Sequence, residues 1–236
     1  MILLTALFGC IVKNEEESEP TMETSTIQAI EDFFGKYRLR RYPKGQILIL
    51  DGENLQHIFY LTSGRVKAYE TSYKGTELVL TIYGPKMFFP VAPLVDRPSQ
   101  FIYEAETDIE VRQAPLKATV EFLKANPELV YGLLGQLHNR VEDILTRMSH
   151  LMASSAKKRL VYELVAECQN FGIPQTDDSY YLAISEKDIG ARAGLSRETV
   201  SREINKLKRE KLVEVRPSNI AILSITELKK HLELIV

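Results

Sequence analysis

The side chains best suited to read nucleic-acid bases lie close together between residues 196 and 210. An arginine can bond the O6 and N7 atoms of guanine together, and a glutamate can accept from the N4 amino group of cytosine. A recognition helix enters the major groove with its N-terminal end first, so its first two turns meet the base edges. We therefore expect base contacts from four residues on one helix face: Arg197, Glu198, Ser201 and Arg202.

Hydroxyl and cationic side chains around the same segment suit contacts to phosphate. Between residues 197 and 211, six Lys and Arg stand against three Glu, so the segment is basic. The alternative is a solvated basic helix whose charges pair along it, as Glu198 and Arg202 would. We expect phosphate contacts from Ser185, Ser196, Thr199, Lys206, Lys208 and Arg209.

The surrounding residues predict a helix-turn-helix, which would position these side chains. Ser185 caps a first helix, with Asp188 placed to complete a capping box. Gly194 then breaks the chain, and Ser196 caps the second helix, the recognition helix at 196–210. Apolar residues at helical spacing supply a small core, namely Ile189, Ala193, Leu195, Val200, Ile204 and Leu207.

Short elements on either side complete this unit. A helix at 156–169 and a short strand at 180–184 precede it. Strands at 212–216 and 220–224, joined by a turn at 217–219, form a wing, and a closing helix carries Leu228 and Leu232.

A long helix comes before this unit in the chain. It begins at Asn126-Pro127-Glu128, with Asn126 as the cap and Pro127 at the first helical position. Apolar residues then recur at alternating steps of four and three, the pattern of a coiled coil. We interpret this seam as a homodimer interface, and the alternative is a stripe packed against the rest of the same chain. The seam consists of Val130, Leu134, Leu137, Val141, Ile144, Met148 and Leu151.

From Arg38 to Ala114 the sequence is typical of strands, with short β-branched and aromatic runs separated by glycine turns. This predicts a β-roll of about eight strands, resembling a double-stranded β-helix or jelly roll, behind a short helix at 27–34. The fold class is therefore α+β. The expected divisions are an N-terminal extension at 1–21, a β-roll effector domain at 22–125, a dimerisation helix at 126–153 and a winged helix-turn-helix domain at 154–236.

Composition excludes several kinds of site. The formal net charge is −2, but residues 154–236 hold 14 Lys and Arg against 12 Asp and Glu, so the average hides a basic C-terminal part. The two cysteines, Cys10 and Cys168, allow neither a disulfide framework nor a four-cysteine zinc or iron–sulfur site. The four histidines include no close pair. We expect no metal, no cofactor and a cytoplasmic location.

The N-terminal segment needs a separate interpretation. Residues 1–12 are apolar and contain Leu7-Phe8-Gly9-Cys10, a weak likeness to a lipoprotein cleavage box. No Lys or Arg precedes this run, whereas a secretory segment has a positive flank and a membrane span needs about 20 apolar residues. We expect a loose arm, or an extension before a start at Met22, and no membrane partner. In the lipoprotein alternative, Cys10 would be the mature N-terminus.

The stretch Gly-Leu-Ser-Arg-Glu-Thr-Val-Ser-Arg at 194–202, followed by Leu207 and Leu212-Val213, resembles the Crp/Fnr family of bacterial transcription regulators. The likeness continues upstream at 42–47, 52–53, 59–61 and 64–66. It implies a cyclic-nucleotide-binding-like β-roll and a homodimer that reads a palindrome of TGTGA-type half-sites through the residues given above. It also implies double-stranded DNA and RNA polymerase as partners and transcription activation as the outcome, although the residues themselves leave repression open.

The sensor region departs from the relatives that bind cyclic AMP. Phe89-Pro90 stands where they carry Gly-Glu for the ribose, and Ser99-Gln100 where they carry an arginine for the phosphate. Without that arginine the bidentate charged contact to phosphate is lost, so control by cyclic AMP in the usual way is not expected and the effector stays unidentified. Aromatic residues there are either core or pocket lining. The effector-pocket candidates are Phe88, Phe89, Pro90, Arg97, Ser99 and Gln100.

Two other functions remain as alternatives. One is a small-molecule sensor with a residual DNA module, which the intact recognition helix argues against. The other is a cupin-like β-barrel enzyme, which would need clustered His and Glu ligands, whereas His57 stands alone in the barrel.

Overall fold

The computed structural model describes residues 24–71, 77–175, 177–216 and 219–233. The expectations about residues 1–21, including Cys10, and about positions 217–218 of the wing turn lie outside the described residues.

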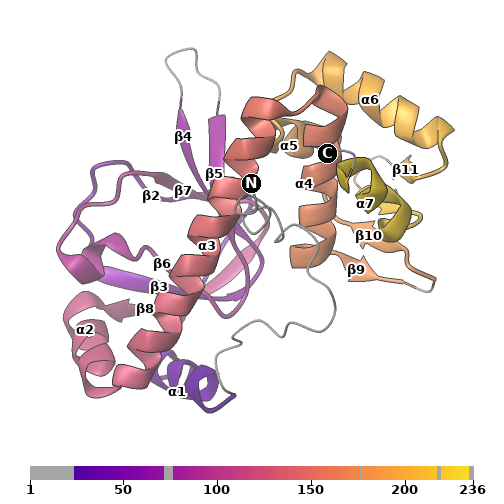
Figure 1. Cartoon of the computed structure of the whole chain (residues 1–236). Coiled ribbons are helices and arrows are strands. Elements are labelled where there is room, and N and C mark those ends of the chain that lie inside the picture. Colours follow the sequence, from indigo (N-terminus) through magenta and orange to yellow (C-terminus); the bar gives the residue numbers. More distant parts are fainter. Residues whose placement is uncertain (1–23, 72–76, 176, 217–218, 234–236) are drawn as a thin grey trace, which may run out of the picture.

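Two antiparallel sheets of four strands each enclose a shared core in the N-terminal part of the chain (Figure 1). Burial alternates along β7 and β8, so each strand turns one side to the core and the other to solvent. The core includes Phe59, Leu61, Val66, Phe89, Tyr103 and Val111. The predicted β-roll is confirmed. Its sheets, ordered β1-β8-β3-β6 and β2-β7-β4-β5, contain β1 (Leu39–Tyr42), β2 (Ile47–Ile49), β3 (His57–Ser63), β4 (Val66–Thr71), β5 (Glu77–Tyr83), β6 (Phe88–Phe89), β7 (Ile102–Ala105) and β8 (Ile109–Pro115).

Short helices cover one end of the roll. The predicted leading helix is α1 (Thr24–Gly35), and a 3-10 turn, η1 (Ala92–Val95), follows β6. A further helix, α2 (Leu116–Ala125), follows β8 directly and was not predicted from the sequence. The rings of Phe33 and Phe122 stack at 4.1 Å between centroids and so join α1 to α2.

The long helix α3 (Pro127–Ala153) begins at Pro127, as predicted from the sequence. Asn126 stands at its N-cap position, but its side chain makes no capping bond to α3. Instead Nδ2 of Asn126 donates to the carbonyl oxygen of Phe122 at 2.7 Å. The prediction that Asn126 caps this helix is therefore wrong. Asn126 is the single residue between α2 and α3, and its side-chain amide bonds a carbonyl oxygen in the last turn of α2 that has no partner within the helix.

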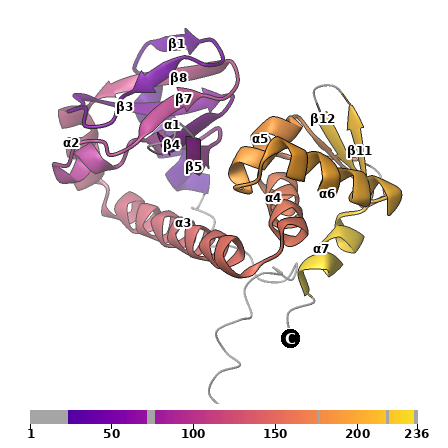
Figure 2. The same cartoon turned by 90° about the horizontal axis from the view of Figure 1, so that it is seen from above.

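One face of α3 packs on the roll and another is open to solvent (Figure 2). Leu129 is buried against the roll together with Leu133. The guanidinium of Arg140 lies 4.5 Å from the ring centre of Tyr83. Contacts within the chain leave six seam residues 41–60% exposed: Val130, Leu134, Leu137, Val141, Ile144 and Met148. The seventh, Leu151, is partly buried near Gly194.

The C-terminal part is a separate core of helices around a four-stranded sheet ordered β11-β12-β10-β9. Leu160, Leu164 and Ile204 are fully buried in it. The predicted helices and wing strands are present. They are α4 (Ala156–Phe171), β9 (Ile173–Pro174), β10 (Tyr180–Leu182), α5 (Glu186–Arg192), α6 (Arg197–Arg209), β11 (Val213–Arg216), β12 (Asn219–Ile222) and α7 (Ile225–Glu233). Within the described ranges, no helix combines the length and apolar character that crossing a membrane requires.

Candidate nucleic-acid interface

Helices α5 and α6 form the predicted helix-turn-helix, and both predicted caps are present. The Ser185 hydroxyl accepts from the backbone N–H of Asp188 at 3.2 Å and donates to its carboxylate at 2.7 Å. The Ser196 hydroxyl accepts from the backbone N–H of Thr199 at 3.3 Å. Gly194 turns the chain between the helices at φ +60°, a conformation that L side chains rarely adopt.

Gly190 is a second glycine on which this turn depends, and the sequence analysis did not single it out. A Cβ on Gly190 would lie 2.6 Å from Cγ2 of Val200 on α6. The two helices therefore cross at this position with no room for a side chain. A glycine four residues before Gly194, inside a capped helix, is the signal that would have indicated the close approach.

The four base-reading candidates lie at the N-terminal half of α6. Arg197, Glu198 and Arg202 are exposed, and Ser201 is partly exposed, while the opposite face of the helix is buried. The pKa of Glu198 is held below its ordinary value, first by a hydrogen bond from its own backbone N–H and then by one from Ser196. Glu198 is therefore ionised and able to accept a hydrogen bond from a base.

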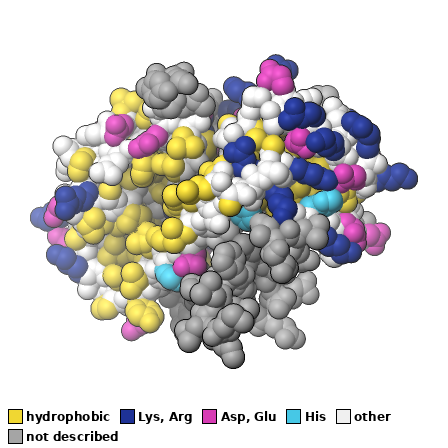
Figure 3. Space-filling model, turned by 45° about the horizontal axis from the view of Figure 1, so that its top comes forward, with side chains coloured by type: hydrophobic (Ala, Val, Ile, Leu, Met, Phe, Trp, Pro, Cys, Tyr) yellow, Lys and Arg dark blue, Asp and Glu magenta, His cyan; other side chains and the backbone are white. Residues whose placement is uncertain are grey.

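The phosphate candidates fall into two groups. The hydroxyls of Ser185 and Ser196 are used in capping, and Ser196 also lies 3.1 Å from the Thr199 hydroxyl. Lys208 and Arg209 are exposed at the far end of α6, about 17 Å along the helix axis from Arg197. Figure 3 shows Lys and Arg side chains gathered over this part of the surface. The intrahelical pair Glu198–Arg202 is not formed, since the carboxylate that Arg202 contacts is that of Glu203.

Four buried charges join the β-roll to the helix-turn-helix domain, and we call them the interdomain charge cluster. Arg65 and Glu106 come from the roll, and Glu167 and Arg192 come from α4 and α5. Across the boundary, Arg65 Nη1 lies 2.6 Å from Glu167 Oε1, and Arg192 Nη2 lies 2.6 Å from Glu106 Oε1. Within each side, Arg65 pairs with Glu106 at 3.2 Å, and Arg192 bonds Glu167. All four side chains are at most 12% exposed.

The charges in this cluster compensate one another. Burial alone would lower the pKa of Arg192, but the charges of Glu106 and Glu167 outweigh it and raise that pKa above its ordinary value. Arg65 also donates to the carbonyl oxygen of Ala183 at 2.9 Å, just ahead of α5. Sequence reasoning missed the cluster because its members are far apart in the chain and share no periodicity.

A third arginine ties α3 to both domains. Arg147 donates to both carboxylate oxygens of Glu163 on α4, each at 2.7 Å. Its remaining nitrogen donates to the carbonyl oxygen of Val79 on β5 at 3.3 Å. The position of the helix-turn-helix domain is thus linked to strand β5 of the roll and to the helix that carries the seam.

The structure does not bring the effector-pocket candidates together. Phe89 is fully buried, with its ring 5.4 Å from that of Phe59 and 5.6 Å from that of Tyr103. Ser99 is buried and donates to the carbonyl oxygen of Phe101 at 3.0 Å. The others differ from one another: Pro90 is buried, whereas Arg97 and Gln100 are exposed. Phe89 and Ser99 therefore serve the core.

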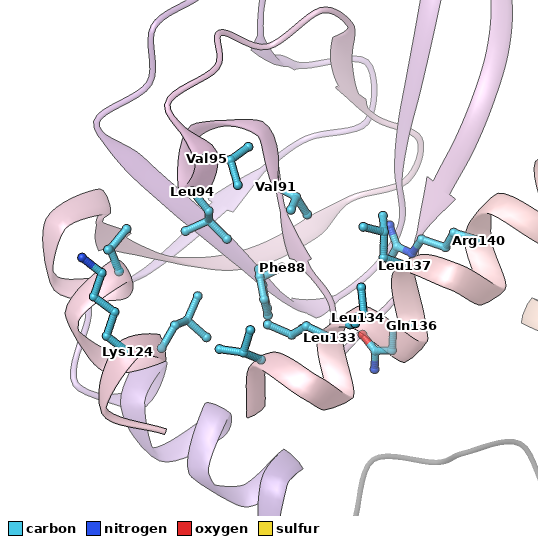
Figure 4. Close-up of a pocket in the computed structure, with 13 residues that line it drawn as sticks. Phe88, Val91, Leu94, Val95, Lys124, Leu133, Leu134, Gln136, Leu137 and Arg140 are labelled. Atoms are coloured by element: carbon cyan, nitrogen blue, oxygen red, sulfur yellow. The ribbon is translucent and has the colours of Figure 1, made fainter. Parts of the chain in front are cut away.

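Phe88 lines a cavity with a volume of about 420 Å³. Figure 4 shows it between the segment that carries Phe88, Val91 and Leu94 on one side and α3 on the other. Its lining is mostly apolar, with Lys124 and Arg140 near its ends. Three seam residues also line it, namely Val130, Leu134 and Leu137. Among the described residues no group of three or more His, Cys, Asp or Glu is placed to hold a metal ion.

Two family models match the chain, the cyclic nucleotide-binding domain over residues 39–126 and the Crp-like helix-turn-helix domain over residues 158–231. The chain belongs to the Crp/Fnr family. The cAMP-activated global transcriptional regulator CRP of Haemophilus influenzae is 25% identical over 221 residues, which are 93% of this chain and 96% of that protein. The global nitrogen regulator of Nostoc sp. is 25% identical over 185 residues, 77% of this chain and 83% of that protein.

The fold is likewise that of solved members of the family. FixK2 from Bradyrhizobium japonicum superposes with a TM-score of 0.73 at 19% sequence identity, covering 85% of this chain and 98% of that one. A Crp-like helix-turn-helix joined to a cyclic nucleotide-binding domain makes this Crp/Fnr protein a DNA-binding transcription regulator and not an enzyme.

Replacing Arg192 by Met tests the interdomain charge cluster. The change leaves Glu106 and Glu167 with one arginine between them in a buried site, so we expect the free energy of unfolding in urea to fall by about 3–5 kcal/mol. Adding Glu167→Gln should recover part of the loss because it removes the excess negative charge. The control is Arg41→Met, since Arg41 is 80% exposed in its pair with Glu110 and its loss should change stability by about 1 kcal/mol or less. Equal losses in the two single variants would contradict this account.

Proposed function

We propose that this Crp/Fnr regulator binds, as a homodimer, a palindromic DNA site with TGTGA-type half-sites. Base reading is assigned to Arg197, Glu198, Ser201 and Arg202 of α6. The observation that carries this assignment is that these polar side chains share the solvent-facing side of a capped helix whose other side is buried. Two such helices, related by a two-fold axis, would enter major grooves one helical turn apart.

The homodimer is assigned to the exposed seam of α3. A 27-residue helix is about 40 Å long, and a row of six half-exposed apolar side chains along it is unfavourable in water. A second copy would bury this row in a coiled coil, with α4 following directly and the recognition helix farther along the chain. The proposal includes the domain boundaries at residues 126 and 154, which set the dimerisation helix apart from the β-roll domain and the winged helix-turn-helix domain.

We further propose that cyclic AMP does not control the protein in the usual way. The residues that replace the ribose and phosphate contacts are used in the core, since Phe89 stacks between two rings and Ser99 bonds the backbone. Whatever the roll senses would act by changing how the helix-turn-helix domain is held, through the interdomain charge cluster and α3. A cytoplasmic location and contact with RNA polymerase complete the proposal, as for a bacterial activator.

Base reading is tested by gel mobility shift and fluorescence anisotropy with a TGTGA-type palindrome. The double change Arg197→Ala with Arg202→Ala should weaken specific binding roughly 30-fold or more, since each good bidentate base contact contributes about 1–3 kcal/mol. Lys208→Ala is the matched control. It should weaken binding to specific and unrelated DNA about equally and reduce the salt dependence by about one phosphate contact. Unchanged specific binding in the double variant would refute the assigned readout.

The dimer is tested by sedimentation velocity. Glutamates at Leu137 and Ile144 would place like charges against one another across the seam, so this double variant should sediment as a monomer where the unmodified chain is a dimer. Ser149→Glu adds a charge on an exposed position of α3 outside the seam and should leave the dimer intact. If the variant with glutamates at positions 137 and 144 is still a dimer, the dimer interface lies elsewhere.

The sensor proposal is tested by calorimetric titration with cyclic AMP. We expect no saturable binding at micromolar concentration, because no arginine stands at position 99 to pair with the phosphate. Titration of the double variant Phe89→Gly with Ser99→Arg serves as the comparison. Saturable binding of cyclic AMP by the unmodified chain, with one site per protomer, would contradict the proposal.

A further inference from the structure

Glu203 is a buried carboxylate on the DNA-reading helix. It belongs to the buried face of α6 with Val200, Ile204 and Leu207, and only 3% of its surface is exposed. Both of its partners are exposed neighbours on the same helix. Arg202 Nε donates to Glu203 Oε1 at 3.2 Å, and Lys206 Nζ lies 3.0 Å from each carboxylate oxygen.

A negative charge at this place needs an explanation. It repels the phosphates that α6 must approach, and a charge taken out of water is unfavourable unless it is paired. Burial alone would raise the pKa of Glu203, but hydrogen bonds from Lys206 and Arg202 outweigh it and hold the pKa below its ordinary value. Glu203 therefore stays ionised, and its charge acts on two residues assigned to DNA contact.

The geometry of Arg202 shows what this pairing can do. Its guanidinium has five N–H donors, and the contact to Glu203 uses the one on Nε. Both Nη groups remain available, and the Arg202 side chain is still 64% exposed. A guanine offers O6 and N7 side by side, which two Nη donors can bond together. A guanidinium that is already held in one orientation loses less conformational entropy on binding DNA than that of an unpaired arginine.

We propose that Glu203 is a positioning residue that determines DNA specificity, holding Arg202 in its base-reading orientation while weakening sequence-independent attraction to DNA. This rests on the proposed base reading by Arg202. By pairing with Lys206 as well, Glu203 withdraws a cation from phosphate contact. The Glu203 carboxylate would thus increase the part of the DNA-binding free energy that comes from a base contact and decrease the part that comes from phosphate contacts.

The test compares Glu203→Met and Glu203→Gln, each with Arg202 present or changed to Ala. Met fills the buried space without an acceptor, whereas Gln keeps an acceptor oxygen and loses the charge. Affinity is measured by anisotropy for the TGTGA-type palindrome, for palindromes with single guanines replaced by adenine, and for unrelated DNA over a range of salt. The guanine read by Arg202 is the one whose replacement no longer matters in Arg202→Ala.

Two effects of opposite sign are expected. Glu203→Met should bind unrelated DNA more tightly, with a salt dependence steeper by about one phosphate contact. It should also discriminate roughly three- to tenfold less well against replacement of that guanine. Glu203→Gln should share the tighter non-specific binding but retain most of the discrimination. In the Arg202→Ala chain neither change should alter discrimination. A purely structural role would instead weaken all binding together.

Glu210→Gln is the matched control. Glu210 closes the same helix and pairs with Lys157 at 2.7 Å, so its loss removes a like charge without touching Arg202. Its discrimination should equal that of the unmodified chain. If Glu203→Met does not fold, NMR relaxation of the Arg202 Nε–H in the unmodified chain gives the answer, since this bond should be more restricted than that of Arg197.

The outcomes separate this inference from the function on which it rests. Loss of discrimination in Arg202→Ala, with none in Glu203→Met, would overturn the role of Glu203 and leave the readout standing. A loss of discrimination caused by Glu203→Met that also occurs in the Arg202→Ala chain would overturn it as well. Full discrimination by Arg202→Ala would refute the base reading and this inference together. An Arg202 Nε–H as mobile as that of Arg197 would overturn the positioning role.

Discussion

Two arginines and two glutamates buried between the β-roll and the helix-turn-helix domain hold these two parts of the chain against each other. Each domain supplies one arginine and one glutamate, so each keeps a neutral pair of its own, Arg65 with Glu106 and Arg192 with Glu167. If the domains part, no lone charge is left behind, only two ordinary ion pairs in water. Such a contact is specific while it is closed, and opening it leaves each charge with a partner from its own domain.

The remaining contacts make α3 the common support of the β-roll and the helix-turn-helix domain. Its inner face packs on the roll through Leu129, its side is tied to β5 and α4 by Arg147, and its outer face carries the seam. A shift of the roll against α3 would therefore change the placement of the helix-turn-helix domain and the seam together. The apolar cavity beside Phe88 borders the roll, α2 and α3, so a change of packing in the cavity would alter the contacts of all three.

Features encoded in neighbouring residues could be predicted from the sequence. The caps at Ser185 and Ser196, the glycine turn and the solvent-facing side of α6 all follow from local spacing, as does the exposure of most of the seam. Contacts between distant residues could not. Arg65 and Arg192 are separated by more than half of the chain, and only folding brings their charges together. The amide of Asn126 was misassigned because two helix ends compete for it, and adjacent Phe88 and Phe89 point to different environments, which a run of aromatics does not distinguish.

Selection of binding sites by the full chain from a random duplex library tests the central claim most directly. The account predicts enrichment of inverted repeats with TGTGA-type half-sites whose centres lie about one helical turn apart. It also predicts that the chain with Arg197→Ala and Arg202→Ala loses this enrichment but still binds DNA without sequence preference. Enrichment of unpaired half-sites, or of the same repeats by both chains, would contradict it.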